Sequence, residues 1–305
     1  MTTSVKTRSG LIARDGYAQY NQGVARLYAP LYGFKDAMSC AGMMTDVPIV
    51  ADGEIHRFQS EGDKRTNGWY VFFGDGGAFG NWRTGLKENW YGGDTCQADR
   101  HKIQAQVKAA QKALQDKRKR KQHQSARIAA RRWQAATATT EHPYLVAKGV
   151  SSHSLRTEDR NLLIPVCHGR QIWSLQIIYP DGRKRFLSGG RTSGCYFPIG
   201  APGERIWLAE GYATAATVHE LTGDAVVCAF NAGNLVNVAA HIRERFTDRK
   251  IYVAADNDKV GIDAAMQAMN THNLEGVKWP DEDKADWNDF CTSHGAQRTL
   301  EALSR

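Results

Sequence analysis

Three clusters of acidic residues each follow a short apolar segment in the last third of the sequence. Their members are Glu210, Asp256, Asp258, Asp286 and Asp289. Asp256 and Asp258 are two residues apart in an extended segment, so their carboxylates point to the same side of the chain. Such hard oxygen donors suit Mg²⁺ or Mn²⁺, which also take water and phosphate oxygens as ligands. The clusters therefore predict a divalent-cation site that handles phosphates.

A second interpretation of the same acids is helix capping. An aspartate at the end of a strand is often only the N-cap of the next helix, and Asp258 or Asp263 could serve in that way. Three acidic clusters at strand ends of one sheet favour the cation site, because gathered anions repel one another and need a cation. Capping remains the alternative for each aspartate taken alone.

The segments that carry these acids alternate between strand and helix patterns. From Arg205 onward the sequence runs RIWLAEG, YATAATVHELTG, AVVCAF, LVNVAAHIRERF, KIYVAADND and GIDAAMQAMNTH. Short apolar strands alternating with helices predict a parallel sheet with crossover connections, and hence an α/β fold. Ligands bind beyond the carboxyl ends of the strands in such sheets, which is where the acids lie.

Residues 161–190 precede this sheet and have a different pattern. Apolar and polar residues alternate on either side of His168-Gly169, and Pro180-Asp181-Gly182 marks a turn. This pattern predicts an antiparallel hairpin or meander.

The ordered motifs resemble the Toprim domain of topoisomerases and primases, and most closely that of plasmid and phage primases. EGYATA at 210–215, FNAGNL at 230–235 and the Asp-x-Asp at 256–258 stand in the order found in conjugative-plasmid and satellite-phage primases. Upstream, KRFLSGG at 184–190 is similar to the basic subdomain that precedes the Toprim domain of the bacterial replicative primase. The similarity covers roughly residues 141–290. It implies a Rossmann-like Toprim sheet preceded by a primase-type basic α+β subdomain.

The resemblance implies a DNA primase, a nucleotidyltransferase that makes short primers on single-stranded DNA from nucleoside triphosphates, for a plasmid, phage or mobile element. It implies that Asp256 and Asp258 hold Mg²⁺ or Mn²⁺, and that Glu210 is a further ligand or the general base or acid. Asp286 and Asp289 become candidates for an outer metal site. Two alternatives are a Toprim nuclease that uses the same cluster for hydrolysis, and a non-catalytic protein that binds single-stranded DNA or counters host defence.

Two further groups of residues gain expected roles from this resemblance. Four basic residues would bind nucleotide phosphates or the template backbone, namely Arg183, Lys184, Arg185 and Arg191. Alternatively, this basic cluster is only a turn exposed to solvent. The loop residues of the sheet edge are Gly211, Asn231, Gly233 and Asn234. Gly211 would allow a sharp turn after the strand. The asparagines either position substrate or cap the helix at 235–246, and capping is favoured.

The positive charge of the chain is concentrated in one segment. The formal net charge is +8, and residues 100–133 hold twelve Lys or Arg and one acid, a balance of +11, so the remainder carries about −3. This segment lacks Gly and Pro and predicts a long polar helix whose apolar positions, such as Ile103 and Val107, are too few for a core. Five successive cations occupy 117–121, namely Lys117, Arg118, Lys119, Arg120 and Lys121. We expect them to bind single-stranded DNA, with a solvated face as the alternative.

The same patterns predict four parts of the chain and the setting in which it works. The parts are an aromatic and Gly-rich α+β module at 1–96, a basic helical linker at 97–140, the basic subdomain at 141–203 and the Toprim domain at 204–305. Aromatic residues of the first part are expected either to stack on bases or, for several of them, to form its core, namely Trp69, Tyr70, Trp82, Trp90 and Tyr91. The six cysteines are scattered with no CxxC, so no zinc is expected, and no segment has the pattern of a secretion signal or a membrane span. We expect a protein of the bacterial cytoplasm that works with a separate replicative helicase, because no GxxxxGK[ST] loop occurs.

Overall fold

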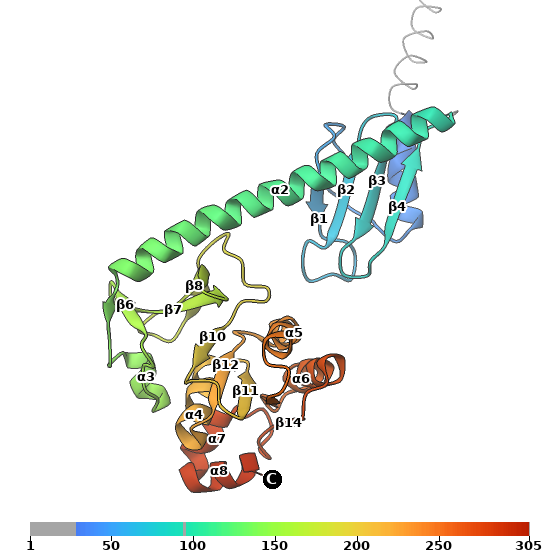
Figure 1. Cartoon of the computed structure of the whole chain (residues 1–305). Helices are drawn as coiled ribbons and strands as arrows, with labels where there is room; N and C mark the ends of the chain where they lie inside the picture. Colours follow the sequence, from blue (N-terminus) through green and yellow to red (C-terminus); the bar gives the residue numbers. More distant parts are fainter. Residues whose placement is uncertain (1–28, 94–95, 305) are drawn as a thin grey trace, which may run out of the picture. The chain divides into compact units, whose positions relative to one another are not determined.

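The computed structural model describes residues 29–93 and 96–304. The chain divides into two compact units, Met1–Lys117 and Arg118–Arg305. A single helix, α2 (Gln97–Ala135), belongs to both units, because the boundary falls within its 39 residues (Figure 1). The basic segment therefore forms one continuous helix, as predicted.

The first unit is built on a four-stranded antiparallel sheet. Its strands, in spatial order, are β1 (His56–Phe58), β2 (Gly68–Phe72), β3 (Gly76–Asn81) and β4 (Lys87–Tyr91). Residues 29–40 are helical and pack Phe34 against Phe72 and Phe79. The expectation that α2 lacks a core was wrong for its first turns. Ile103 and Val107 are buried in a core with residues of β2 and β3, and Ile103 occupies the space that Gly76 of β3 leaves open.

The second unit begins with a five-stranded antiparallel sheet. The elements are β5 (Thr137–Ala138), α3 (Pro143–Lys148), β6 (Arg156–Glu158), β7 (Asn161–His168), β8 (Gln171–Ile178) and β9 (Lys184–Phe186). The strands follow one another in the sheet in chain order, so the predicted meander is confirmed. The last turns of α2 pack Ala129 and Trp133 on this sheet.

The second sheet of this unit is the predicted α/β sheet. Its strands are β10 (Phe197–Ile199), β11 (Arg205–Ala209), β12 (Ala225–Cys228), β13 (Lys250–Ala254) and β14 (Gly276–Lys278). Their spatial order is β10-β12-β11-β13-β14, and all neighbours are parallel except β10, which pairs antiparallel with β12 at the edge. The parallel sheet is thus confirmed, and the antiparallel edge strand is an addition to the expectation.

Helices cover both faces of this sheet (Figure 1). They are α4 (Tyr212–Thr222), η1 (Ala232–Asn234), α5 (Leu235–Arg245), α6 (Lys259–His272), α7 (Trp287–His294) and α8 (Ala296–Ser304). One core contains side chains of α4, α7 and α8, and a separate core contains side chains of α5 and α6. Two cores on opposite sides of one sheet are what parallel strands with crossover helices produce.

The described residues contain no helix that is both long enough and apolar enough to span a membrane. All six cysteines are free, and Cys195 and Cys228 are buried in the second unit.

Candidate active site

The acidic residues predicted from the sequence lie at the carboxyl edge of the parallel sheet. Glu210 directly follows β11 and Asp256 lies two residues after β13. These strands are neighbours, and Ala209 is paired with Ala254 at their last positions. The chain register therefore brings Glu210 and Asp256 to the same edge, as the sequence predicted.

Asp256 is the most perturbed carboxyl group of this edge. Its pKa is raised to about 7, first by burial and then by the charges of Glu210, Asp286, Asp258 and Asp289 in that order. Its Oδ1 atom is buried and has no hydrogen-bond partner among the described residues. A buried carboxylate oxygen without a partner is costly unless something absent from the chain satisfies it.

Glu210 is held beside this group. Burial raises the pKa of Glu210, a hydrogen bond from the backbone of Ala232 opposes that shift, and the charges on Asp258 and Asp286 add to it. Lys184 lies close enough to lower the same pKa. The carboxylates therefore interact electrostatically although they come from three separate segments.

The capping interpretation also holds for two of the aspartates. Asp258 is the N-cap of α6 and accepts a hydrogen bond from Gly261 N at 2.7 Å. Asp286 is the N-cap of α7 and accepts from the backbone N–H groups of Asn288 and Asp289, both at 2.8 Å. Each of these side chains thus has a structural task at the edge where the charges gather.

The donor set fits a hard divalent cation, although no metal cage is preassembled. Among the described residues, no group of three or more His, Cys, Asp or Glu side chains is arranged to hold a metal ion. The fit rests on chemistry: the oxygens are carboxylates, and Asp256 Oδ1 is buried and unpartnered amid like charges. A cation would supply that partner and relieve the repulsion.

One of the four basic residues predicted near the acids lies beside them. Lys184 projects from β9 with its ammonium 4.9 Å from the centre of the Tyr144 ring. Burial lowers the pKa of Lys184, and the negative charges of Asp286 and Asp256 oppose that shift. Although the residue as a whole is exposed, its charged end therefore lies in a desolvated position next to the acids.

The other three basic residues are held elsewhere. Arg183 is exposed and folds back on Asp181, with Nε 2.6 Å from the carboxylate. Arg191 donates to the carbonyl of Ser193, and its guanidinium lies 5.3 Å from the centre of the Trp173 ring. Arg185 is exposed on the strand β9. The structure does not bring these three together with Lys184.

A cleft of about 480 Å³ opens beside Lys184. Tyr144 and Lys148 of α3 line it together with Asp289 of α7. Lys148 Nζ lies 2.7 Å from Asp289 Oδ1. Burial lowers the pKa of Lys148, but the hydrogen bond to Asp289 and the charge of Asp286 outweigh burial and raise it. Sequence reasoning missed Tyr144 and Lys148; their only local signal is a short helix with Pro143 at its start and Gly149 at its end.

The asparagine loop does not cap a helix, contrary to the expectation. Neither Asn231 nor Asn234 makes a side-chain capping bond. Asn234 is buried; its Oδ1 accepts from Gly194 N at 2.8 Å, and its Nδ2 donates to the carbonyls of Cys195 and Ala229. This side chain therefore ties the end of β12 to the loop before β10.

Neither Gly211 nor Gly233 needs to be a glycine for the backbone to turn, contrary to the expectation for Gly211. Gly211 has a φ of −105°, which any residue adopts, and a side chain there would meet open space. Gly233 likewise would place a side chain in ordinary contact with Asn231 only. The strained residue of the loop is Phe230, whose φ is +71°. Its ring packs edge-on against Phe186, which lies two residues after Lys184 on β9.

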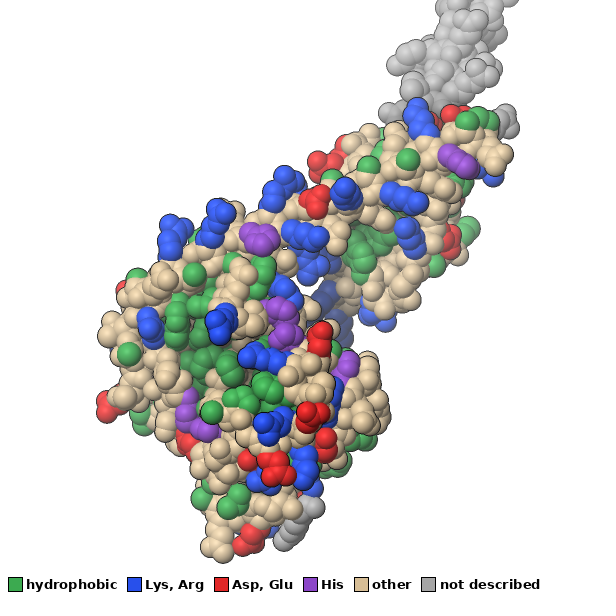
Figure 2. Space-filling view, in the orientation of Figure 1, with side chains coloured by type: hydrophobic (Ala, Val, Ile, Leu, Met, Phe, Trp, Pro, Cys, Tyr) green, Lys and Arg blue, Asp and Glu red, His purple; other side chains and the backbone are tan. Residues whose placement is uncertain are grey.

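The basic run of α2 remains exposed from Lys117 to Lys121, and none of its five side chains forms an ion pair within the described residues. Figure 2 shows Lys and Arg side chains spread along the surface of this helix. At its end, Lys121 lies against Gly189, where a side chain would come within 2.7 Å of the lysine stem. Close approach at Gly189 thus accommodates α2, with Ser125 Oγ donating to the carbonyl of Ser188 at 2.9 Å.

The aromatic residues of the first unit divide by exposure. Trp69 and Tyr70 are buried and form part of its cores. Trp90 and Tyr91 are half-buried, whereas Trp82 is 48% exposed. Of the five predicted stacking residues, Trp82 is the one with a largely open surface.

Comparison with known proteins supports the expected family for the parallel sheet. The family model described as the Toprim domain matches residues 205–297. Two proteins of Escherichia coli named DNA primase TraC are similar to the chain, at 36% identity over 270 residues and 34% over 265. These alignments cover 80% and 79% of this chain but 25% and 18% of the relatives, so the chain spans a quarter or less of their length. Among solved structures, the primase fragment of the bacteriophage T7 primase-helicase protein has a TM-score of 0.45 and 18% identity, covering 56% of this chain and 77% of that chain.

Proposed function

We propose that the chain is a DNA primase of the plasmid type, which makes short primers on single-stranded DNA by metal-dependent nucleotidyl transfer. The observation that carries this proposal is the buried, unpartnered Oδ1 of Asp256, which lies among the charges of Glu210 and Asp286. The Toprim match over 205–297 and the similarity to proteins named DNA primase support it.

The acids are the proposed site of the cation. Asp256 and Asp258 would hold Mg²⁺ or Mn²⁺, Glu210 would be either a further ligand or the general base, and Asp286 would serve an outer position. When bound, the cation neutralises charge on the transferring phosphoryl group and activates the attacking hydroxyl. Asp289 is the weakest candidate for this set, because it forms an ion pair with Lys148.

Primer synthesis joins a 3′-hydroxyl to the α-phosphate of a nucleoside triphosphate, breaks the bond to the β-phosphate and releases pyrophosphate. The site must therefore stabilise negative charge and accept the proton of the hydroxyl. Lys184 lines the cleft beside the acids and is suited to bind the phosphates of the incoming nucleotide, whereas Lys148 lies in the same cleft but is paired with Asp289. Glu210, whose carboxylate the backbone of Ala232 orients, is suited to accept the proton of the hydroxyl. A desolvated position strengthens each of these interactions relative to water.

The template would be a single strand bound through its phosphates. The exposed cations of α2 from Lys117 to Lys121 are free of ion pairs within the described residues and are suited to this role, as are Arg185 and Arg191. We also propose that a separate helicase exposes the template and that the protein works in the cytoplasm of a bacterial host.

The test is incubation of the protein with single-stranded DNA, labelled nucleoside triphosphates and Mg²⁺ or Mn²⁺. Template-dependent primers support the proposal. Degradation of the template would favour a Toprim nuclease, and retention without chemistry would favour a non-catalytic binder. The Asp256→Asn variant is the control, because a contaminating polymerase would be unaffected by it.

A further inference from the structure

The exposed Trp82 is the outer part of a stack on the first unit. Its ring lies 5.8 Å from the ring of the buried Trp69, with 29° between their planes, and the guanidinium of Arg57 lies 4.8 Å from its centre. Arg57 and Trp69 are opposite each other on β1 and β2, and Trp69 is opposite Gly80 on β3. A side chain at Gly80 would come within 3.0 Å of the Trp69 ring, so the glycine leaves room for the stack.

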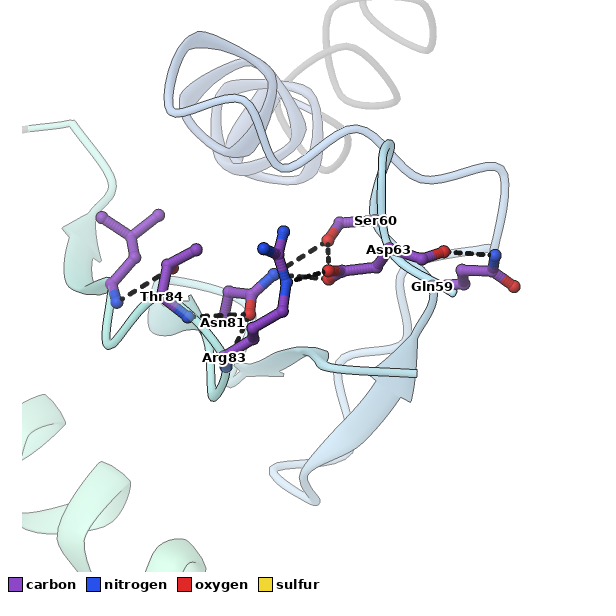
Figure 3. Close-up of polar contacts among 7 residues, drawn as sticks. Gln59, Ser60, Asp63, Asn81, Arg83 and Thr84 are labelled. Carbon is purple, nitrogen blue, oxygen red and sulfur yellow. Dashed lines mark hydrogen bonds and ion pairs between the residues drawn. The ribbon is translucent and has the colours of Figure 1, made fainter. Parts of the chain in front are cut away.

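A buried polar network fixes the turn that carries Trp82 (Figure 3). The carboxylate of Asp63 is fully buried and accepts hydrogen bonds from Ser60 at 2.8 Å, from Asn81 at 2.7 Å and from Arg83. These hydrogen bonds, the first from Ser60 and the next from Asn81, lower the pKa of Asp63 to about 2, so it stays ionised. Asn81 and Arg83 flank Trp82 in sequence, so the network fixes the backbone of the turn, and the ring itself contacts Trp69 and Arg57.

The backbone adds to the same anchoring. Trp82 N donates to the carbonyl of Asn67 at 3.0 Å, and Asn81 Oδ1 accepts from Arg83 N at 2.8 Å. An exposed aromatic ring on a preset turn loses little conformational entropy on binding, which is the condition for an efficient contact.

Arg57 brings positive charge onto the stack, and two further cations of the unit follow Asp63 in the sequence. Lys64 and Arg65 follow Asp63 and are exposed, and like Arg57 they form no ion pair within the described residues. Arg57 uses its guanidinium to donate to the carbonyl of Thr66. A partly exposed aromatic ring with an arginine over it, in a unit with further exposed cations, is complementary to a ligand with planar groups on an anionic backbone.

The helix α2 leaves the sheet at the end where Trp82 lies. Its early residue Ile103 contacts Gly76 at the start of β3, whereas Gln111 accepts a hydrogen bond from Lys87, which is opposite Gly80 near the end of β3. Continuing in this direction, the helix reaches Lys117, the first cation of the basic run, within the same unit. The stack and the start of the basic run therefore lie toward one end of the first unit.

We propose that Trp82 and Arg57 form a stacking platform for the unpaired bases of a single-stranded nucleic acid, with Lys64 and Arg65 binding its phosphates. Bases in a duplex are already stacked on each other, so the platform favours single strands. The platform works through binding alone, so it stands or falls independently of primer synthesis by the second unit.

The test measures binding of the full-length protein to a labelled oligo-dT strand without nucleotides or metal. Trp82→Ala should weaken binding by about 5- to 150-fold, the range expected when base–aromatic stacking is removed. Trp82→Phe should keep most of the affinity because it retains a ring. Tyr32→Ala is the matched control, since Tyr32 is another exposed aromatic residue of this unit, and it should bind like the wild type.

A strand of the same length without bases separates stacking from charge. The wild type and Trp82→Ala should bind this abasic strand equally, whereas Arg57→Ala together with Lys64→Ala and Arg65→Ala should weaken binding to both strands. Equal affinity of Trp82→Ala and the wild type for oligo-dT would overturn the proposal. The proposal would also be overturned if Trp82→Ala weakened binding to the abasic strand as much as binding to oligo-dT, because the effect would then come from altered folding or charge.

Discussion

Asp258 accepts a hydrogen bond from the backbone N–H of Gly261 at 2.7 Å and so begins helix α6. Two residues earlier, Asp256 has a buried Oδ1 with no partner among the described residues. The two members of the Asp-x-Asp pair therefore differ in what the folded chain requires of them. Asp258 has a structural role that an amide can also perform, whereas no described residue provides a hydrogen-bond partner for the Oδ1 atom of Asp256.

We expect Asp256→Asn to lower primer synthesis by at least about 100-fold without lowering the thermal stability of the protein. Removing a charge from a group of mutually repelling carboxylates relieves repulsion in the metal-free state. Thermal unfolding with and without Mg²⁺ checks this separately from activity: Mg²⁺ should raise the unfolding temperature of the wild type and not that of the variant. Full activity of Asp256→Asn would refute the assignment.

Asp258→Asn and Asp258→Ala should differ from each other. Asparagine caps a helix about as well as aspartate, so Asp258→Asn should keep the stability and lose activity only through the missing charge. Asp258→Ala should lose activity and also about 1 kcal/mol of stability. Denaturant unfolding of both variants makes the comparison, and equal stability would mean that the Gly261 bond contributes nothing.

Glu210→Gln should reduce turnover by about 10²- to 10⁴-fold, because the amide keeps the size of the side chain but cannot accept a proton. The hydrogen bond from Ala232 can be retained by the amide oxygen, so the fold should persist. Steady-state synthesis at saturating template and nucleotide measures the effect. A reduction of less than about threefold would move Glu210 to a structural role near the start of α4.

Substitutions of the adjacent cations Lys184 and Arg183 should differ in their effect on activity. Lys184→Ala should lower activity by about tenfold or more and raise the KM for nucleotide, because the variant removes a charged donor to the phosphates. Arg183→Ala should stay within about twofold, because Arg183 is exposed and engaged with Asp181. Equal reductions of activity in the two variants would mean that the proximity of the Lys184 side chain to the acids does not affect activity.

Replacing Lys117 to Lys121 by glutamine should flatten the dependence of binding on salt. For single strands, the slope of log affinity against log salt changes by about 0.7 for each phosphate that the protein no longer neutralises, so three phosphates correspond to about 2. Activity should recover partly at high template concentration because the acids are untouched. The control replaces Arg249 and Arg298, which are exposed cations outside the run. An unchanged slope would mean that these five cations are exposed to solvent and do not bind the nucleic acid.

Asp63 should stabilise the first unit in a pH-dependent manner. The pKa of Asp63 is lowered from 3.8 to about 2, chiefly by hydrogen bonds from Ser60 and Asn81. Its stabilising contribution is therefore complete above 3.8 and is lost as the pH falls through about 2. Asp63→Asn should unfold more easily at neutral pH, and its difference from the wild type should shrink in acid. Intrinsic tryptophan fluorescence, to which the buried Trp69 contributes, follows the unfolding. A difference in stability that grows in acid would contradict this account.

The parallel sheet and the edge where the acids gather follow from the sequence alone. Alternating strand and helix patterns are local properties, and crossover connections then force the strands to run in one direction. Glu210 and Asp256 closely follow apolar strands, so their position at the carboxyl edge is a consequence of that pattern.

Which of the candidate side chains face one another depends on the tertiary structure. Alternation along β9 places Lys184 and Phe186 on one side, but only pairing of the strands brings that side to Tyr144 and Phe230. In the same way, Asn234 was expected to cap its own helix and instead bonds Gly194, forty residues away. Exposure of Trp82 and burial of Trp69 were equally invisible in sequence, because both are aromatic residues near turns. Burial and partner choice depend on contacts between distant segments, and a local pattern carries no information about those contacts.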